Sequence, residues 1–269
     1  MSAPVPVHFV DEGPRDAPAV VLSGSLGSTL AMWDPQVPAL SGRFRVIRYD
    51  HRGHGGSPVP PGPYEVSELA GDVVALLDRL EVTRAHLCGL SLGGQVVMWI
   101  AAHAPDRVDR LVLCCTSAWF GPPEPWLERA ETVRARGTGA VARAVVGRWF
   151  TPGFAAANPG IVEQTRAMIA ATPPEGYAAC CEAVGRADLR ADLAAIRAAT
   201  LVVGGAQDPG VRPDRIEELS AKISGSRVAV VDPAAHLANV EQAERVTRLI
   251  LDHLGSPPKV ALSPQARSE

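Results

Sequence analysis

The chain has 269 residues, of which 46% are hydrophobic and 20% charged, so it can bury a sizeable core without metals or disulfides. Its formal net charge of −3 offers no basic surface to nucleic acid or to an anionic membrane. The longest apolar run, residues 96–102, is far shorter than the roughly 20 residues of a membrane helix, so we expect no membrane span.

Two further features of the sequence favour a cytoplasmic protein. The first six residues lack the basic and apolar segments of a secretory signal. The five cysteines are an odd number, and four of them are two pairs of sequence neighbours, which is a poor layout for a disulfide framework. We therefore expect the cysteines to be reduced and mostly buried.

Short β-branched runs predict a series of buried parallel strands. These runs lie at residues 20–22, 46–47, 86–88, 111–113, 201–203 and 228–231. Helical patterns lie between them, as in the apolar residues between Leu69 and Leu80 that share one helical face. Near the end of the chain, Asn239 and Gln242 indicate a capping box that opens a last helix running towards His253. Strands that alternate with helices predict an α/β fold with a mostly parallel sheet covered by helices.

One long segment interrupts this alternation, from about Ser117 to Ala198. It contains no convincing strand, and seven prolines divide it into short helical pieces. We predict a helical lid at residues 117–198, inserted between two strands of a core that comprises residues 1–116 and 199–254. Residues 255–269 are rich in proline and serine and show no apolar periodicity, so we expect a disordered tail there.

The strongest local motif is Gly-Leu-Ser-Leu-Gly at residues 89–93, between a predicted strand and an apolar helix. A G-x-S-x-G pattern in this context is typical of a nucleophile elbow, a tight turn that holds a serine hydroxyl out at the edge of the sheet. The alternative is a glycine-rich turn with a solvated serine. The flanking strand and helix favour Ser91 as a nucleophile.

A serine nucleophile needs a base that is itself oriented by a third group. Asp208 and His236 each follow a predicted strand, where the carboxyl ends of parallel strands form a common edge. We therefore predict Asp208 as the acid and His236 as the base. Asp232 is the alternative acid, but its position directly after a strand favours a role in capping a loop. The other histidines fit structural or surface roles better.

Acyl transfer also needs N–H donors for a developing oxyanion. The predicted donors are the amides of Leu92, directly after the serine, and Leu26, in a loop after the strand at residues 20–22. The alternative for this loop is a phosphate cradle, but it lacks the lysine and the glycine spacing of nucleotide-binding loops. We also find no residues at metal-ligand spacing. We therefore expect no cofactor and no metal.

Residues from about Val7 to Leu254 resemble the α/β-hydrolase superfamily and, more closely, the 3-oxoadipate enol-lactonases of aromatic catabolism. The resemblance is carried by Gly-Ser-Leu-Gly-Ser at residues 24–28 with residues 32–36, by residues 48–55, and in the predicted lid by residues 148–152 and 171–177. It implies an α/β-hydrolase fold and hydrolysis of a small enol-lactone in the β-ketoadipate pathway. Carried over by position, it implies the same nucleophile, acid, base and oxyanion donors.

The enol-lactone implied by this resemblance carries a free carboxylate, which needs a partner once water is excluded. An arginine can bind both carboxylate oxygens at once. Trp126 and Arg129 share one face of a predicted helix, so we predict that Arg129 binds the carboxylate while Trp126 packs against the ring. Arg134, Arg148 and Trp149 are further candidates for substrate binding. The alternative is that these arginines are solvated surface charges.

Other functions fit the same pattern. A carboxylesterase, a perhydrolase-like enzyme or a hydrolase of carbon–carbon bonds would keep the same three catalytic residues and differ in the lid. A non-catalytic receptor on this fold would bind a ligand with little turnover. Enzymes of this fold that use an aspartate nucleophile are disfavoured by Ser91. The expected partner of the predicted hydrolase is a small-molecule lactone or ester substrate.

Overall fold

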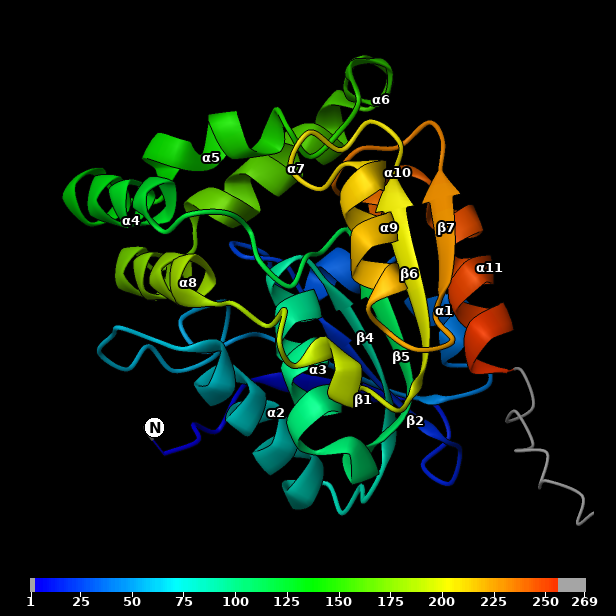
Figure 1. The fold of residues 1–269 in the computed structure, drawn as a ribbon. Coiled ribbons are helices and arrows are strands. Elements are labelled where there is room, and N and C mark those ends of the chain that lie inside the picture. Colours follow the sequence, from blue (N-terminus) through cyan, green and yellow to red (C-terminus); the bar gives the residue numbers. More distant parts are fainter. Residues whose placement is uncertain (1–2, 256–269) are drawn as a thin grey trace, which may run out of the picture.

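The computed structural model describes residues 3–255, which form one seven-stranded sheet with helices on both faces (Figure 1). The strand order is β1-β3-β2-β4-β5-β6-β7. Only β1 is antiparallel to its neighbour. The strands are β1 (Phe9–Glu12), β2 (Ala19–Ser23), β3 (Arg45–Tyr49), β4 (Ala85–Leu90), β5 (Val108–Cys114), β6 (Ala199–Gly205) and β7 (Arg227–Val231). The predicted mostly parallel α/β sheet is therefore confirmed.

Helices cover the two faces of the sheet unequally. One face carries α2 (Val66–Arg79), α3 (Leu92–His103) and α9 (Pro213–Ala221), and the other carries α1 (Val37–Leu40) and α11 (Ala243–Leu254) (Figure 1). Every residue of β2, β3 and β4 is buried. Strands that are buried on both faces have near-continuous apolar sequences, which is why short β-branched runs were sufficient to predict them.

Between β5 and β6 the chain forms five α-helices and the short 3-10 helix η3 (Leu193–Ala195). The α-helices are α4 (Glu124–Arg136), α5 (Gly139–Val146), α6 (Pro152–Ala157), α7 (Pro159–Ala170) and α8 (Pro174–Arg186). Three of them begin with a proline, whose fixed φ angle and missing N–H suit the first position of a helix. Figure 1 shows this helical insertion above the carboxyl ends of the parallel strands. It therefore covers the edge at which the predicted catalytic residues lie.

The predicted capping box at the start of the last helix is wrong. Asn239 lies inside a separate short helix, α10 (Ala238–Glu241), and α11 begins after Gln242 without a side-chain cap. The amide nitrogen of Asn239 donates to the carbonyl of Met32 at 3.1 Å and to the side chain of Gln36 at 3.3 Å. This tertiary contact uses the polar group that a capping box would need.

Three other expectations concern the cysteines, membrane spans and the tail. All five cysteines are buried and free, as expected. None of the helices within residues 3–255 is long and apolar enough to cross a membrane. The predicted tail lies, apart from Gly255, outside the described residues.

Candidate active site

Ser91 lies at the turn between β4 and α3 in a backbone conformation that L-residues rarely adopt, with φ 57° and ψ −116°. Two glycines allow the chain to pack tightly around this turn. A Cβ atom on Gly89 would lie 2.2 Å from the carbonyl oxygen of Gly93, and a Cβ on Gly93 would lie 2.2 Å from that of Ser23. A strained backbone conformation such as that of Ser91 persists only where the surrounding structure enforces it. The turn thus has the strand–turn–helix geometry that the G-x-S-x-G pattern predicts.

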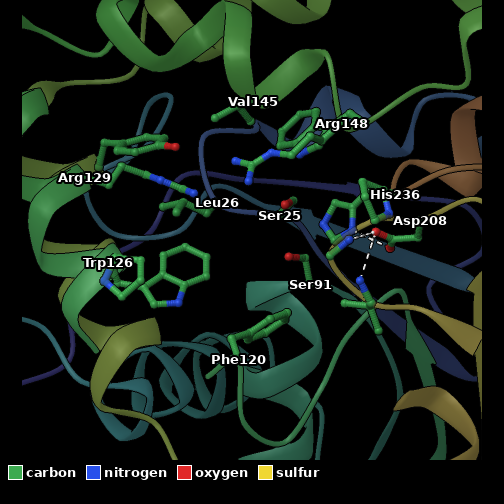
Figure 2. A pocket seen from close by; sticks show the side chains of 16 residues that line it. Ser25, Leu26, Ser91, Phe120, Trp126, Arg129, Val145, Arg148, Asp208 and His236 are labelled. Atoms are coloured by element: carbon green, nitrogen blue, oxygen red, sulfur yellow. Dashed lines mark hydrogen bonds and ion pairs between the residues drawn. The ribbon is translucent and has the colours of Figure 1, made fainter. Parts of the chain in front are cut away.

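Ser91 lines a cavity of about 270 Å³ between the sheet and the helical insertion (Figure 2). Both parts of the chain contribute to its wall. The sheet side supplies Ser25, Leu26, Ser91, Asp208, Pro209, Gly210, Val211 and His236, and the insertion side supplies Phe120, Pro125, Trp126, Arg129, Val145, Arg148, Trp149 and Tyr177. Segments that are far apart in the sequence therefore meet in one cavity.

Asp208 and His236 are paired within this cavity. Oδ2 of Asp208 lies 2.7 Å from Nδ1 of His236. The other carboxylate oxygen accepts the backbone N–H groups of Gly210 at 2.8 Å and Val211 at 3.0 Å, which fixes the orientation of the carboxylate. Because a carboxylate oxygen accepts, Nδ1 of the imidazole is assigned as the N–H donor. Nε2 is then left to accept a proton.

Asp232, the alternative acid, does not line the cavity. Its Oδ1 accepts a hydrogen bond from Nε2 of Gln207 at 2.7 Å, and Oε1 of Gln207 accepts the backbone N–H of Ala234. Asp232 therefore braces the loops that follow β6 and β7. This geometry favours Asp208 as the partner of the histidine.

The loop that carries His236 is tied to the helical insertion. The backbone N–H of Leu237 donates to the carbonyl of Trp149 at 2.9 Å, and the Trp149 ring centroid lies 6.2 Å from that of His236. The buried carboxylate of Glu241 accepts the N–H of Ala235 at 2.9 Å and also binds the hydroxyl of Thr151. No hydrogen bond joins Ser91 to His236 within residues 3–255, and catalytic contacts of this kind often tighten only when substrate binds.

The backbone N–H groups of Leu26 and Leu92 donate to no acceptor in the described part of the chain. Leu92 is the first residue of α3, so its N–H has no helical acceptor, and the helix dipole favours negative charge there. Leu26 lines the cavity from the loop that follows β2. The N–H of Leu92 directly follows Ser91 in the chain, and Leu26 lines the same cavity as Ser91, an arrangement suited to a developing oxyanion.

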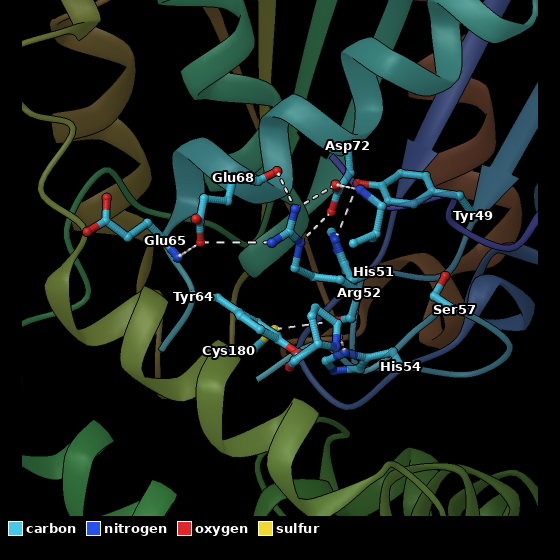
Figure 3. Close-up of polar contacts among 12 residues, drawn as sticks. Tyr49, His51, Arg52, His54, Ser57, Tyr64, Glu65, Glu68, Asp72 and Cys180 are labelled. Carbon is cyan, nitrogen blue, oxygen red and sulfur yellow. Dashed lines mark hydrogen bonds and ion pairs between the residues drawn. The ribbon is translucent and has the colours of Figure 1, made fainter. Parts of the chain in front are cut away.

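Figure 3 shows a network of polar side chains that follows β3 and includes His51 and His54. These two histidines contact the loop that carries Leu26. Nε2 of His51 donates to the carbonyl of Gly24 at 3.0 Å, and Nε2 of His54 accepts the N–H of Gly27 at 2.9 Å. Burial lowers the pKa of each histidine to about 4, so both are neutral at pH 7. These two histidines therefore have a structural role. No group of His, Cys, Asp and Glu suited to a metal ion occurs among residues 3–255.

Two arginines point into the cavity from the helical insertion (Figure 2). The guanidinium of Arg129 lies 4.6 Å from the ring centroid of Trp126. Neither Arg129 nor Arg148 forms an ion pair with a carboxylate within the described residues. Burial, and next the neighbouring Arg129 charge, lower the pKa of Arg148. Two cations without acidic partners make this part of the cavity suited to an anion.

Two of the predicted substrate-binding residues need correction or refinement. Arg134 lies outside the cavity lining, because its guanidinium binds Glu175 at 2.9 Å and also Glu182, so its prediction as a substrate ligand is wrong. Trp126 lines the cavity, but Arg129 covers a face of its ring and Phe120 lies edge-on at 6.0 Å. Trp126 thus positions Arg129 as well as lining the wall.

Several residues of the cavity wall, chiefly Phe120 and Tyr177, are not predicted from the sequence. Tyr177 is fully buried, and burial raises its pKa. Its ring lies against the loop of Leu26, since a Cβ on Gly27 would be 2.8 Å from it. The only available signal was its place at the end of the stretch 171–177. Phe120 had no signal, because it lies outside any motif.

Known proteins are similar to this chain over most of its length. The alpha/beta hydrolase fold family matches residues 18–243. The chain is 40% identical to 3-oxoadipate enol-lactonase 2 of Acinetobacter baylyi, over 89% of this chain and 90% of that protein. It is 31% identical to a carbamate hydrolase candidate, RutD, of Stutzerimonas stutzeri, over 89% of this chain and 92% of that one. The solved enol-lactonase from Burkholderia xenovorans LB400 has a TM-score of 0.91 and 43% identity, with 93% of this chain and 96% of that chain covered.

Proposed function

Because this chain belongs to the alpha/beta hydrolase family and is a carboxylic ester hydrolase, we propose that it opens 3-oxoadipate enol-lactone to 3-oxoadipate. The substrate is a small lactone with one free carboxylate. The observation that carries the proposal is a single cavity that holds Ser91, the Asp208–His236 pair and two arginines that form no ion pair with a carboxylate of residues 3–255.

In the first half of the reaction, Oγ of Ser91 attacks the lactone carbonyl carbon while Nε2 of His236 takes the hydroxyl proton. Asp208 keeps the imidazole in the required tautomer and stabilises the imidazolium that forms. The N–H groups of Leu26 and Leu92 stabilise the tetrahedral oxyanion. The ring C–O bond then breaks, and the leaving enol oxygen takes the proton from His236.

In the second half, water releases the acyl group from Ser91. His236 takes a proton from the attacking water and returns it to Oγ as the ester bond to Ser91 breaks. The product is a single molecule that carries the new carboxylate and the enol from the first half, and this enol tautomerises to the ketone. The net change is addition of one water, and no step uses a cofactor.

The free carboxylate of the substrate binds Arg129, with Arg148 as the second cation of the subsite. A buried carboxylate needs such partners, and an arginine fork can contact both oxygens. Trp126 and Trp149 line the same wall, where Trp126 contacts Arg129 and Trp149 lies beside His236. Residues 117–198 serve as the lid over the core of residues 1–116 and 199–254. A cavity of about 270 Å³ suits a small ring rather than a long acyl chain.

A rate comparison on three substrates tests the proposal against the other functions of this fold. The panel is the enol-lactone, 4-nitrophenyl acetate and a small aryl carbamate. We expect kcat/KM for the anionic lactone to exceed that for either neutral compound by at least about tenfold, because only the lactone engages the arginines. A preference for the carbamate or for the neutral ester would contradict the proposal. Binding of the lactone without turnover would instead indicate a receptor.

A further inference from the structure

The two N–H donors assigned to the oxyanion belong to peptide units whose carbonyls are held from the opposite side. The N–H of Leu26 shares its peptide unit with the carbonyl of Ser25, and that of Leu92 with the carbonyl of Ser91. Both units are trans. In a trans peptide, the N–H and the C=O point in opposite directions. A group that fixes the carbonyl therefore fixes the direction of the N–H.

Ser28 fixes the first of these carbonyls. Its Oγ donates to the carbonyl oxygen of Ser25 at 2.7 Å, and its backbone N–H donates to the same oxygen at 3.1 Å. Ser28 is only 2% exposed, so water does not compete for this contact. With the carbonyl held on this side, the N–H of Leu26 points away from Ser28.

Thr116, just after β5, fixes the second carbonyl. Its Oγ1 donates to the carbonyl oxygen of Ser91 at 2.7 Å, and the N–H of Gln95 reaches the same oxygen at 3.2 Å. Thr116 is fully buried. The unusual φ and ψ of Ser91 mean that local preference does not hold this peptide unit in place, so the contacts around it must do so.

Glycines make room for both hydroxyls. A Cβ on Gly24 would lie 2.8 Å from Oγ of Ser28, and a Cβ on Gly94 would lie 2.5 Å from Oγ1 of Thr116. A side chain at either position would displace the hydroxyl from its carbonyl. The same arrangement of a buried hydroxyl, a held carbonyl and an adjacent glycine thus occurs at each of the two peptide units.

We infer that the hydroxyls of Ser28 and Thr116 are positioning groups that aim the two N–H donors of the oxyanion hole. The inference rests on the proposed function, and neither residue touches the reacting atoms. Its physical basis is that donors stabilise a transition state best when they need no reorientation as the charge develops. Loss of either hydroxyl should therefore destabilise the transition state more than it weakens the binding of the substrate.

The test compares Ser28→Ala and Thr116→Val with wild type for turnover of 4-nitrophenyl acetate and the enol-lactone, and for inhibition by phenylboronic acid. The boronate adduct on Ser91 mimics the tetrahedral intermediate. We expect kcat to fall about 5- to 50-fold, less than the roughly 10²- to 10³-fold loss when an oxyanion donor itself is removed. KM should stay within about twofold, and the inhibition constant should rise by a factor similar to the loss in kcat.

Two further variants separate positioning from a loss of packing. Thr116→Ser keeps the hydroxyl and should recover most of the wild-type kcat. Thr138→Val is the matched control, because Oγ1 of Thr138 donates to the buried carbonyl of Thr172 at 2.8 Å away from the cavity lining. It should leave kcat and boronate inhibition unchanged. If one of the two test variants fails to fold, the other decides.

If Ser28→Ala and Thr116→Val fold and keep the wild-type kcat and boronate inhibition, the inference is overturned. The proposed function would then still stand. An equal loss in Thr138→Val would overturn the inference as well, because the effect would then be one of general packing. A wild-type protein that hydrolyses neither the ester nor the lactone would overturn the proposed function, and the inference with it.

Discussion

Asp208 and His236 lie 28 residues apart in the sequence, yet Oδ2 of the aspartate is 2.7 Å from Nδ1 of the imidazole. The sheet explains this proximity. Asp208 follows β6 and His236 follows β7, and these two strands are parallel neighbours, so both residues emerge at the same edge. The backbone N–H groups of Gly210 and Val211 then orient the carboxylate.

This pairing predicts unequal effects of two similar substitutions. Asp208→Asn should lower kcat by about 10⁴, because the amide favours the wrong imidazole tautomer and removes charge stabilisation. Asp232→Asn should cost far less, since Asp232 contacts Gln207 rather than His236. Steady-state kinetics on the enol-lactone checks both variants, and circular dichroism confirms that they fold. A larger loss in Asp232→Asn would exchange the two roles.

The substrate subsite predicts a loss that depends on substrate charge. A hydrogen bond to a charged group contributes about 1.5–3 kcal/mol, so Arg129→Ala should reduce kcat/KM on the anionic lactone by about 10- to 150-fold. The neutral ester should lose little. Arg134→Ala is the matched control, because Glu175 and Glu182 bind its guanidinium outside the cavity lining. Equal losses of Arg129→Ala on both substrates, or none, would remove Arg129 from the subsite and leave Arg148.

Buried neutral histidines predict how stability depends on pH. Burial lowers the pKa of His51, His54 and His253 to about 4, while unfolded histidines titrate near 6.5. At pH values between about 4 and 6.5, the unfolded chain thus binds more protons than the folded chain. The free energy of unfolding is therefore highest above pH 6.5 and falls as the pH drops towards 4. Each histidine contributes up to about 3 kcal/mol of this loss.

Denaturant unfolding at several pH values, with proton uptake measured near pH 5.5, checks this dependence. We expect unfolding to take up more than about two protons there. His253→Gln should reduce the uptake by about one proton. A free energy of unfolding that is constant from pH 7 to 5 would show that these histidines are not held neutral in the fold.

Much of this fold could be predicted from the sequence because its signals are local. A strand buried on both faces is apolar throughout, and an elbow serine needs small neighbours within two or three residues. Asp208 and His236 could be predicted because each follows a strand of one parallel sheet. The position of Leu26 at the cavity could be predicted for the same reason, because its loop follows β2.

The parts that could not be predicted depend on tertiary contacts. The packing of α4 on α8 decides whether an arginine of the insertion faces the cavity or a carboxylate. Arg134 binds Glu175 across that contact. The amide of Asn239 contacts η1 (Leu30–Trp33) about 200 residues away instead of capping a helix. Tyr177 reaches the cavity only because α8 packs against the loop of Gly27.

The most direct test of the central claim is the initial rate of enol-lactone opening, followed by loss of lactone absorbance, for wild type and Ser91→Ala. The account predicts rapid opening by wild type and a loss of about 10⁵ to 10⁶ in Ser91→Ala, with an unchanged thermal unfolding midpoint. Retained activity in a clean, folded Ser91→Ala preparation would show that another group attacks the lactone. A wild-type rate no higher than the spontaneous hydrolysis of the lactone would contradict the proposed function itself.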